Sequence, residues 1–540
     1  MKRLITGLVL LTTLAALAGA EFRIDVTPMK TLPIQVGGRI KPLDTFSREA
    51  VRLITGKASF QGEEPVATVL RWWASPEAAR NEKNIELRNL ALKKKLGLPD
   101  ERFFSSTELD QNPEFNKLRE QVHQRMRGED EELTSEEKEV QQVLVKMASL
   151  ENVASGAAIT VVPNPAGLEQ AWGSLADLSH PEVIESLYPL RDSAEALRTA
   201  LANEDQAAFA TALEQFRSGL AQVGPTPPQG AMAREVFFNS FHPFRKAWII
   251  YLVGFLCLLF APAGRESKLY WVGLCLATMG FCLHAYGFYL RCMIAGRPPV
   301  TNMYESVIWV AFGAVLFSLI FEYFYKARNY VLASTGAAVV CLILADTLPA
   351  VLDPSIKPLT PVLRNNFWLT VHVLTITLGY AAFLLSLGLG HMALFKYAFR
   401  PDQEESVKNL NQALYKSIQV GVLFLAAGTI LGGVWANYSW GRFWGWDPKE
   451  VWALIALLGY LAILHGRYAG WLREFGMAAW SVVAFLGVLM AWYGVNFVLG
   501  AGLHSYGFGT GGYKYVAIYV LVEFAFVGAM TLKHRNRLRS

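Results

Sequence analysis

A series of long apolar runs in the second half of the chain most constrains what it can fold into. They lie near residues 247–262, 269–290, 304–325, 330–348, 368–398, 415–435, 450–466, 474–498 and 514–532. Most reach the roughly 20 residues with which an α-helix crosses a bilayer, where each backbone polar group must be hydrogen-bonded within the helix. The sequence therefore predicts an all-α, polytopic membrane domain of about nine helices over residues 246–540.

The first half of the chain has a different composition. Residues 1–20 read as a signal peptide, with Lys2 and Arg3, an apolar stretch and a small-residue cleavage site. An uncleaved anchor is the alternative, although the apolar stretch is short for a span. Residues 21–245 are charge-rich and predict a mainly helical extracytoplasmic domain. Within it, residues 32–57 predict a turn at Gly37-Gly38 and a helix cap at Asp44 or Thr45.

The loop charges predict the orientation in the membrane. If the chain enters the first span from outside, the inner connections are short and rich in Lys and Arg, as the positive-inside rule expects. The outer loops are then residues 291–303, 349–366, 436–449 and 499–513. This pattern predicts a multi-pass protein of the bacterial inner (cytoplasmic) membrane, with the N-terminal domain and these loops on the periplasmic side.

Composition excludes several classes of protein. With 53% hydrophobic and only 18% charged residues, the chain is not an ordinary soluble enzyme. The net charge of +5 is spread over the ends of apolar runs and forms no basic stripe, so we expect no nucleic acid partner. The five cysteines form no C-x-x-C pair and no C-x-x-C-H motif. Any haem that the chain handles is therefore not held covalently.

The third outer loop is rich in tryptophan and glycine. Residues 435–452 read WANYSWGRFWGWDPKEVW and contain Trp435, Trp440, Trp444, Trp446 and Trp452. An interfacial tryptophan belt is the plain structural interpretation. The alternative is a ligand site, because Gly441 and Gly445 let the backbone approach closely and the rings could then line a flat shelf. Such a shelf suits a large planar ligand whose carboxylates meet Arg442 or Lys449.

Two histidines are predicted to lie level with this loop. His372 falls about five residues into the fifth span, roughly 7 Å below its outer end, and His504 lies in the glycine-rich fourth outer loop. A single intramembrane histidine is more often a satisfied core residue. A pair at matched depth beside a tryptophan shelf favours ligation of haem iron from both faces of the ring.

A third histidine lies deeper. His465 follows Trp452 by 13 residues on one predicted helix, which places it roughly 20 Å further inward. Intramembrane ionisable residues are costly and tend to mark a pathway or a site, so His465 is a candidate inner ligand. The alternative is an interfacial residue. His284 and His391 are competitors without an aromatic loop beside them.

Several of these motifs together resemble a known family. Residues 440–452, followed by LHGR at 464–467, are similar to the tryptophan-rich WWD motif of haem-handling proteins of cytochrome c maturation. Residues 367–372 (FWLTVH), 494–507 (GVNFVLGAGLHSYG) and 302–306 (NMYES) are similar to the CcsA (ResC) family of the System II cytochrome c synthase. The resemblance covers roughly residues 245–535.

The resemblance implies a path for haem b, a transiently bound substrate. Haem enters from the cytoplasmic side, binds at an inner site that includes His465, and is presented outside between His372 and His504, beside the tryptophan loop and its Asp447. There its vinyl groups react with the thiols of C-x-x-C-H apocytochromes c. The chain would act in a haem-lyase complex with a separate ResB (CcsB)-like membrane protein, which residues 21–245 do not resemble. A haem exporter and a non-catalytic membrane complex subunit are the alternatives.

Overall fold

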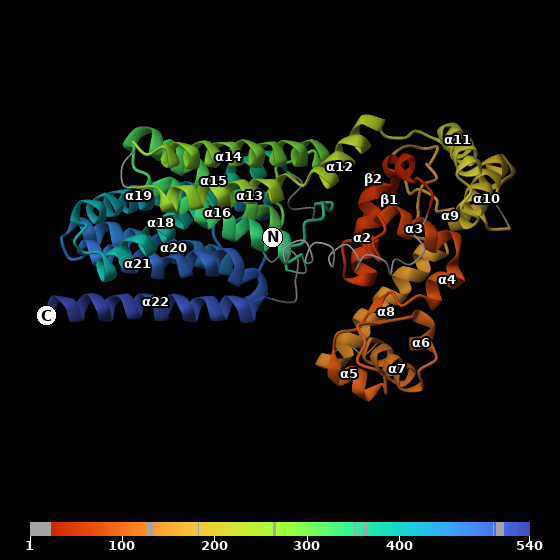
Figure 1. The fold of residues 1–540 in the computed structure, drawn as a ribbon, viewed down its shortest axis with the longest axis horizontal. Coiled ribbons are helices and arrows are strands. Elements are labelled where there is room, and N and C mark those ends of the chain that lie inside the picture. The colour runs from red at the N-terminus through yellow and green to blue at the C-terminus, as the bar shows by residue number, and fades with distance from the viewer. Residues whose placement is uncertain are drawn as a thin grey trace, which may run out of the picture. The chain divides into compact units, whose positions relative to one another are not determined.

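The computed structural model describes residues 23–127, 133–181, 183–262, 266–349, 351–359, 365–500, 502–503 and 512–539. It divides into two compact units, Met1–Ser240 and Phe241–Ser540, whose elements are labelled in Figure 1. The predicted signal peptide and His504 lie outside the described residues.

The first unit is mainly helical. Its helices are α2 (Leu43–Thr55), α3 (Pro65–Ala74), α4 (Pro76–Asn81), α5 (Leu90–Lys95), α6 (Ser106–Asp110), α7 (Pro113–Arg127), α8 (Ser135–Ala154), α9 (Leu175–Leu178), α10 (Tyr188–Ala202), α11 (Gln206–Val223) and α12 (Gln229–Phe241). Short 3-10 turns lie at Thr27–Thr31 and Glu185–Leu187. Two small antiparallel pairs complete it, β1 (Pro33–Val36) with β2 (Arg39–Pro42) and β3 (Ile85–Glu86) with β4 (Phe103–Phe104).

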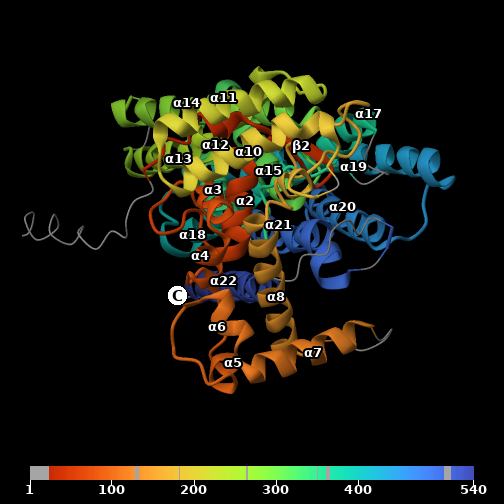
Figure 2. The same ribbon diagram turned by 90° about the vertical axis from the view of Figure 1, so that its right-hand side faces the viewer.

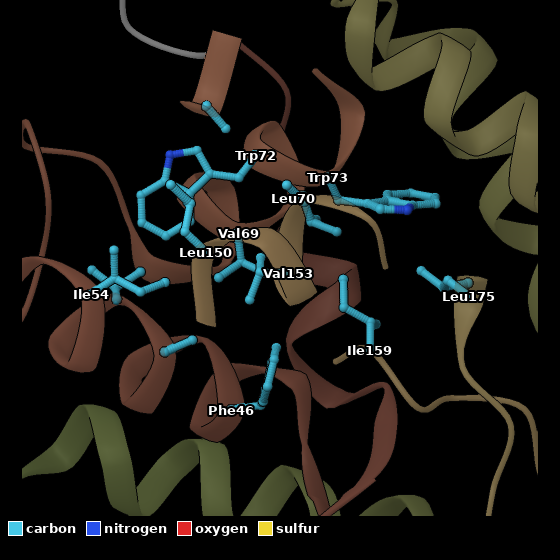
Figure 3. Packing of buried hydrophobic residues seen from close by; sticks show 14 of the residues in the cluster. Phe46, Ile54, Val69, Leu70, Trp72, Trp73, Leu150, Val153, Ile159 and Leu175 are labelled. Atoms are coloured by element: carbon cyan, nitrogen blue, oxygen red, sulfur yellow. The ribbon is translucent and has the colours of Figure 1, made fainter. Parts of the chain in front are cut away.

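An apolar core holds the first unit together. Figure 3 shows Phe46 and Ile54 of α2, Trp72 of α3 and Leu150 of α8 meeting in this core, and Ile54 and Trp72 are fully buried. Burial of one such side chain stabilises a fold by about 1.5–3 kcal/mol. The amphipathic helices α2, α3 and α8 therefore need one another to remove their apolar faces from water.

The predicted turn at Gly37-Gly38 is confirmed, because both glycines have positive φ and join β1 to β2. The predicted cap is wrong: α2 begins at Leu43, its N-cap is Pro42, and no side chain caps it. Asp44 and Thr45 instead turn to α12. The Asn239 amide of α12 donates to Asp44 Oδ2 at 2.9 Å and to Thr45 Oγ1 at 2.8 Å.

The second unit confirms the predicted all-α membrane architecture. Its elements are α13 (Pro243–Phe260), α14 (Lys268–Ala295), α15 (Met303–Tyr325), α16 (Asn329–Thr347), α17 (Asn366–Trp368), α18 (Leu374–Phe399), α19 (Glu404–Trp440), α20 (Pro448–Tyr468), α21 (Glu474–Leu489) and α22 (Tyr513–Arg539). Two π-helical segments, η4 (Leu369–Val373) and η5 (Met490–Leu499), precede α18 and continue α21. Among the described residues, nine continuous helices are long and apolar enough to cross a membrane.

Helix α18 lies at the centre of this bundle. It packs against α15, α16, α19, α21 and α22, and Figure 2 views the bundle nearly end-on. Glycines allow the closest contact, that between α18 and α19. A Cβ on Gly379 would lie 2.8 Å from the Leu425 backbone nitrogen, and one on Gly428 would lie 2.6 Å from Ile376 Cα. Small residues at helix crossings let transmembrane backbones approach in this way.

Candidate functional site

The structure holds His372 in a defined orientation. It lies in η4, half-buried, and its Nδ1 is 2.8 Å from the backbone carbonyl oxygen of Gly428 in α19. A carbonyl oxygen only accepts, so Nδ1 carries the proton and Nε2 carries the lone pair in neutral imidazole. This is the arrangement in which a histidine binds a metal, its other nitrogen being fixed by a hydrogen bond. The π-helical turn is itself a feature that occurs mostly at functional sites.

Glycine and aromatic residues surround this imidazole. A Cβ on Gly432 would lie 2.6 Å from His372 Cε1, so only glycine fits beneath the ring. The centroid of Trp435 lies 5.6 Å from that of His372, and Trp435 stacks on Trp368 with an interplanar angle of 7°. The nearly parallel aromatic pair beside His372 is therefore Trp368 and Trp435.

The tryptophan loop is shorter than predicted. Helix α19 continues to Trp440 and α20 begins at Pro448, so Trp435 and Trp440 lie on α19 and Trp452 lies on α20. Gly441 ends α19 in the left-handed conformation that favours glycine. The apolar run 415–435 placed the start of the loop at residue 436, which is too early because the helix extends beyond the apolar run to Trp440.

The loop tryptophans do not form one flat shelf. The rings of Trp444 and Trp446 are perpendicular, with centroids 5.9 Å apart. Trp446 is 70% exposed and has a φ of +58°, a conformation that a bulky side chain rarely adopts. Phe443 connects this loop to the His372 side of the site, because its ring occupies the space that a Gly433 side chain would need.

Arg442 makes its contacts within the tryptophan loop and the helix that follows it. Arg442 lies over Trp440 and pairs with Glu450, with 3.1 Å between Arg442 Nη1 and Glu450 Oε1. Its guanidinium also fills the place of a Gly445 side chain. The charge of Arg442 is therefore largely compensated by a carboxylate of its own loop. Contact of either Arg442 or Lys449 with a ligand stays a prediction.

Asp447 joins the tryptophan loop to the fourth outer loop. Its Oδ1 accepts from the backbone N–H of Lys449 at 3.0 Å and so caps α20. Its Oδ2 accepts from the backbone N–H of Leu503 at 2.6 Å. Gly502, at φ +95°, has no room for a Cβ, which would lie 2.3 Å from Asp447 Oδ2. Asp447 thus fixes the residue that directly precedes His504.

The other histidines separate into distinct environments. His465 is exposed on α20, with Nδ1 2.7 Å from the Leu461 carbonyl oxygen, so Nε2 carries its lone pair. His391 engages both nitrogens, Nδ1 with the Leu387 carbonyl and Nε2 with Glu523 of α22 at 2.9 Å. His284 is fully buried among aromatic rings. Of the three, His465 has the environment best suited to a ligand that comes from outside the bundle.

Sequence reasoning missed Trp368, Glu450 and the two glycines beneath and beside His372. The sequence does contain a signal for Glu450, because an acidic residue three positions after Asp447 is a capping-box pattern. In the structure, Glu450 Oε2 accepts from the backbone N–H groups of Asp447 and Gly445. Gly428 and Gly432 also had a signal, as a small-x-x-x-small pattern on a transmembrane helix.

These features define the class of the protein: a multi-pass membrane protein with a half-buried, hydrogen-bonded histidine beside a pair of aromatic rings. A family model described as "Cytochrome C assembly protein" matches residues 300–504. The chain is 33% identical over 302 residues to a protein named CcsA from a Synechococcus strain, covering 98% of that protein and 49% of this chain. It is also 36% identical over 248 residues to a CcsA of Prochlorococcus marinus, covering 78% of it and 40% of this chain.

A longer relative matches most of the chain. Protein NrfI of Wolinella succinogenes is 30% identical over 499 residues, which is 87% of this chain and 53% of NrfI. The chain thus spans about half the length of NrfI. With its resemblance to CcsA confirmed, the chain belongs to the CcsA family of cytochrome c biogenesis proteins.

Proposed function

We propose that this chain is the haem-binding subunit of a cytochrome c synthase, which carries haem b across the bacterial inner membrane and presents it on the periplasmic side. The observation that carries the proposal is the hydrogen bond from His372 Nδ1 to the Gly428 carbonyl, which places the lone pair of the neutral imidazole on Nε2. The parallel rings of Trp368 and Trp435 beside it offer the flat apolar faces that a porphyrin stacks against.

His504 is the proposed second axial ligand. The bond from Leu503 N–H to Asp447 supports this assignment, because it anchors the fourth outer loop to the tryptophan loop one residue before His504. Two neutral imidazoles then hold the iron from opposite faces. Each cysteine of a C-x-x-C-H apocytochrome adds its S–H across one vinyl group, so a C–S bond forms and the hydrogen moves to the neighbouring carbon. The chain itself positions the reactants and excludes water.

The rest of the proposed assembly keeps the roles that the family resemblance implies. His465 is the proposed inner ligand on the cytoplasmic side, facing a ResB (CcsB)-like membrane partner, and residues 21–245 form the proposed extracytoplasmic domain after cleavage of residues 1–20. Arg442 and Lys449 remain the proposed contacts for the haem carboxylates, with Lys449 favoured because Glu450 already pairs with Arg442.

Purification tests the proposal against its two rivals. The chain, co-expressed with a ResB-like partner, is expected to carry a Soret band and to attach haem covalently to an added C-x-x-C-H peptide. A haem exporter would release haem to an acceptor without forming a thioether. A membrane complex subunit without a cofactor would show no Soret band, and that result contradicts the proposal.

Trp446 provides a prediction that separates binding from stability. A non-glycine residue in the left-handed region costs about 1 kcal/mol or more, so Trp446→Gly is expected to leave the thermal stability equal or higher. Haem per protein is expected to fall severalfold, because an exposed aromatic face is lost. Trp471→Ala, at an 88% exposed tryptophan outside the loop, is the matched control. Loss of inserted protein in Trp446→Gly with normal haem per protein would instead indicate a membrane anchor.

His465 provides a prediction about the order of the two sites. If haem passes the inner site first, His465→Ala is expected to reduce haem at both sites severalfold, whereas His372→Ala leaves the inner site able to retain haem. Haem per protein is measured with the partner co-expressed, and Tyr468→Ala, 90% exposed on the same helix, is the control. Full haem content and normal maturation in His465→Ala would show that His465 has an interfacial role only.

A further inference from the structure

Glu305 lies buried at the start of α15 with two arginines around it. Its side chain is 1% exposed, and its Oε1 accepts from Arg291 Nε at 2.8 Å, where Arg291 is also 1% exposed. Arg297 Nη1 lies 3.9 Å from Glu305 Oε2. This stretch belongs to the NMYES motif, which the proposed function leaves without a role.

The carboxylate organises the second span's outer connection. Glu305 Oε2 accepts from the Thr301 backbone N–H at 2.8 Å and from Thr301 Oγ1 at 2.6 Å. The Thr301 hydroxyl in turn accepts from Arg297, and Asn302 caps the Glu305 backbone N–H. Thr301 is therefore tied directly to the Glu305 carboxylate, and Arg297 is tied to it through Thr301.

The two arginines extend this hold to the next outer segment. Arg291 Nη1 donates to the Pro354 carbonyl oxygen at 3.0 Å, and Arg297 Nη2 donates to the Lys357 carbonyl oxygen at 2.6 Å. Residues 354–357 precede the helix that carries His372. Glu305 thus holds two outer segments that are about 50 residues apart in the sequence.

The two segments that lead to the proposed haem ligands both contact this region. The Asn366 amide, at the start of the helix leading to His372, lies 3.4 Å from the Gly296 carbonyl oxygen. Trp492 of η5, which leads to the His504 loop, donates from Nε1 to Ser306 Oγ at 2.8 Å. Residues 296–306, which include Glu305, therefore touch the element that precedes each proposed ligand.

We propose that Glu305, with Arg291, is a positioning residue for the outer haem site, an inference that rests on the proposed function. It sets the spacing between the His372 segment and η5 by holding the 296–302 turn and the 354–357 segment. A buried ion pair can often be replaced by apolar residues without loss of stability, so stability alone gives no reason for a pair at this place. The backbone carbonyls of residues 354 and 357 give such a reason, because an arginine side chain has several N–H donors and can bind a carbonyl and a carboxylate at the same time.

Two variants test the inference. Glu305→Gln leaves Arg291 without its counter-charge, and the double variant Arg291→Met with Glu305→Met removes both charges and both backbone holds. Glu322→Gln is the matched control, because Glu322 is a buried glutamate at the opposite end of α15. Haem spectrum and cytochrome c maturation are measured per inserted chain, with and without added imidazole.

We expect both Glu305 variants to lose at least tenfold in maturation and to lose the six-coordinate low-spin haem spectrum, while Glu322→Gln keeps both. Imidazole is expected to restore part of each, because it fills the coordination position that a displaced histidine leaves open; a misfolded chain would not respond. Normal maturation per inserted chain in the double variant would overturn the inference, whatever its abundance.

A comparison with His372→Ala keeps the two proposals distinguishable. If His372→Ala loses the low-spin spectrum and the Glu305 variants keep it, only the positioning role fails. If His372→Ala itself keeps the spectrum and the maturation, the proposed outer site fails first.

Discussion

Replacing His372 with alanine is expected to abolish cytochrome c maturation and to convert outer-site haem to a five-coordinate form. The imidazole is held by the Gly428 carbonyl at 2.8 Å and lies over Gly432, a residue that has no side chain with which to replace it. Iron with one axial ligand is more easily oxidised and more easily lost. We expect a loss of at least a hundredfold in covalently haem-loaded cytochrome.

The measurement is haem-stained cytochrome c per inserted chain, together with the absorption spectrum of the purified protein. Imidazole at millimolar concentration is expected to restore part of the activity. His123→Ala, at an exposed histidine of the first unit, is the control for general effects of the substitution. Unchanged maturation in both His372→Ala and His504→Ala would show that the outer iron ligands lie elsewhere.

The second large effect is expected from the contact between Asp447 and the fourth outer loop. Asp447 uses one oxygen for the Lys449 N–H and the other for the Leu503 N–H. Asparagine has only one acceptor oxygen, so Asp447→Asn can make one of these bonds and must present an N–H group to the other donor. We expect at least a tenfold loss of outer-site haem in Asp447→Asn.

Gly502→Ala is expected to disrupt the same contact, between Asp447 and the fourth outer loop, from the side of that loop. Its new methyl group would lie 2.3 Å from Asp447 Oδ2, at a φ of +95° that alanine disfavours. The two variants are therefore expected to share one phenotype: normal insertion, loss of the low-spin spectrum and partial recovery with imidazole. Gly459→Ala, at a helical glycine with open space around it, is the control for a glycine substitution. Full haem retention in Gly502→Ala would show that the contact between Asp447 and the fourth outer loop does not position His504.

The sequence predicts the architecture better than the site because the two depend on different information. Apolar length alone indicates each of the membrane helices, since lipid leaves the backbone no other partner. The cap of α2 was wrong because Asp44 is used by Asn239, some 195 residues later, and no local pattern contains that partner. Asp44 Oδ2 also accepts from Arg48 Nε at 2.8 Å, so this oxygen has two side-chain donors while the side chain caps no backbone N–H group of α2.

The site shows the same limit. His372 was predicted as a ligand from its depth, but its hydrogen bond to Gly428 depends on how η4 packs against α19, which no spacing in either segment specifies. The stacked pair of Trp368 and Trp435 has the same origin, since its two rings come from different helices. The perpendicular rings of Trp444 and Trp446 occur together with a left-handed backbone at Trp446, and no pattern in the sequence indicates that unusual conformation.

The π-helical segment Leu369–Val373 makes the direction of His372 sensitive to the deletion of a single residue. A π-turn holds one more residue than an α-turn, so deletion of Val373 would let the segment close as an ordinary α-helix. His372 would then directly precede Leu374 and would point in a different direction about the helix axis. Its imidazole would leave the Gly428 carbonyl although no residue of the site had been exchanged. Within this segment the number of residues, as much as their identity, determines which way the histidine faces.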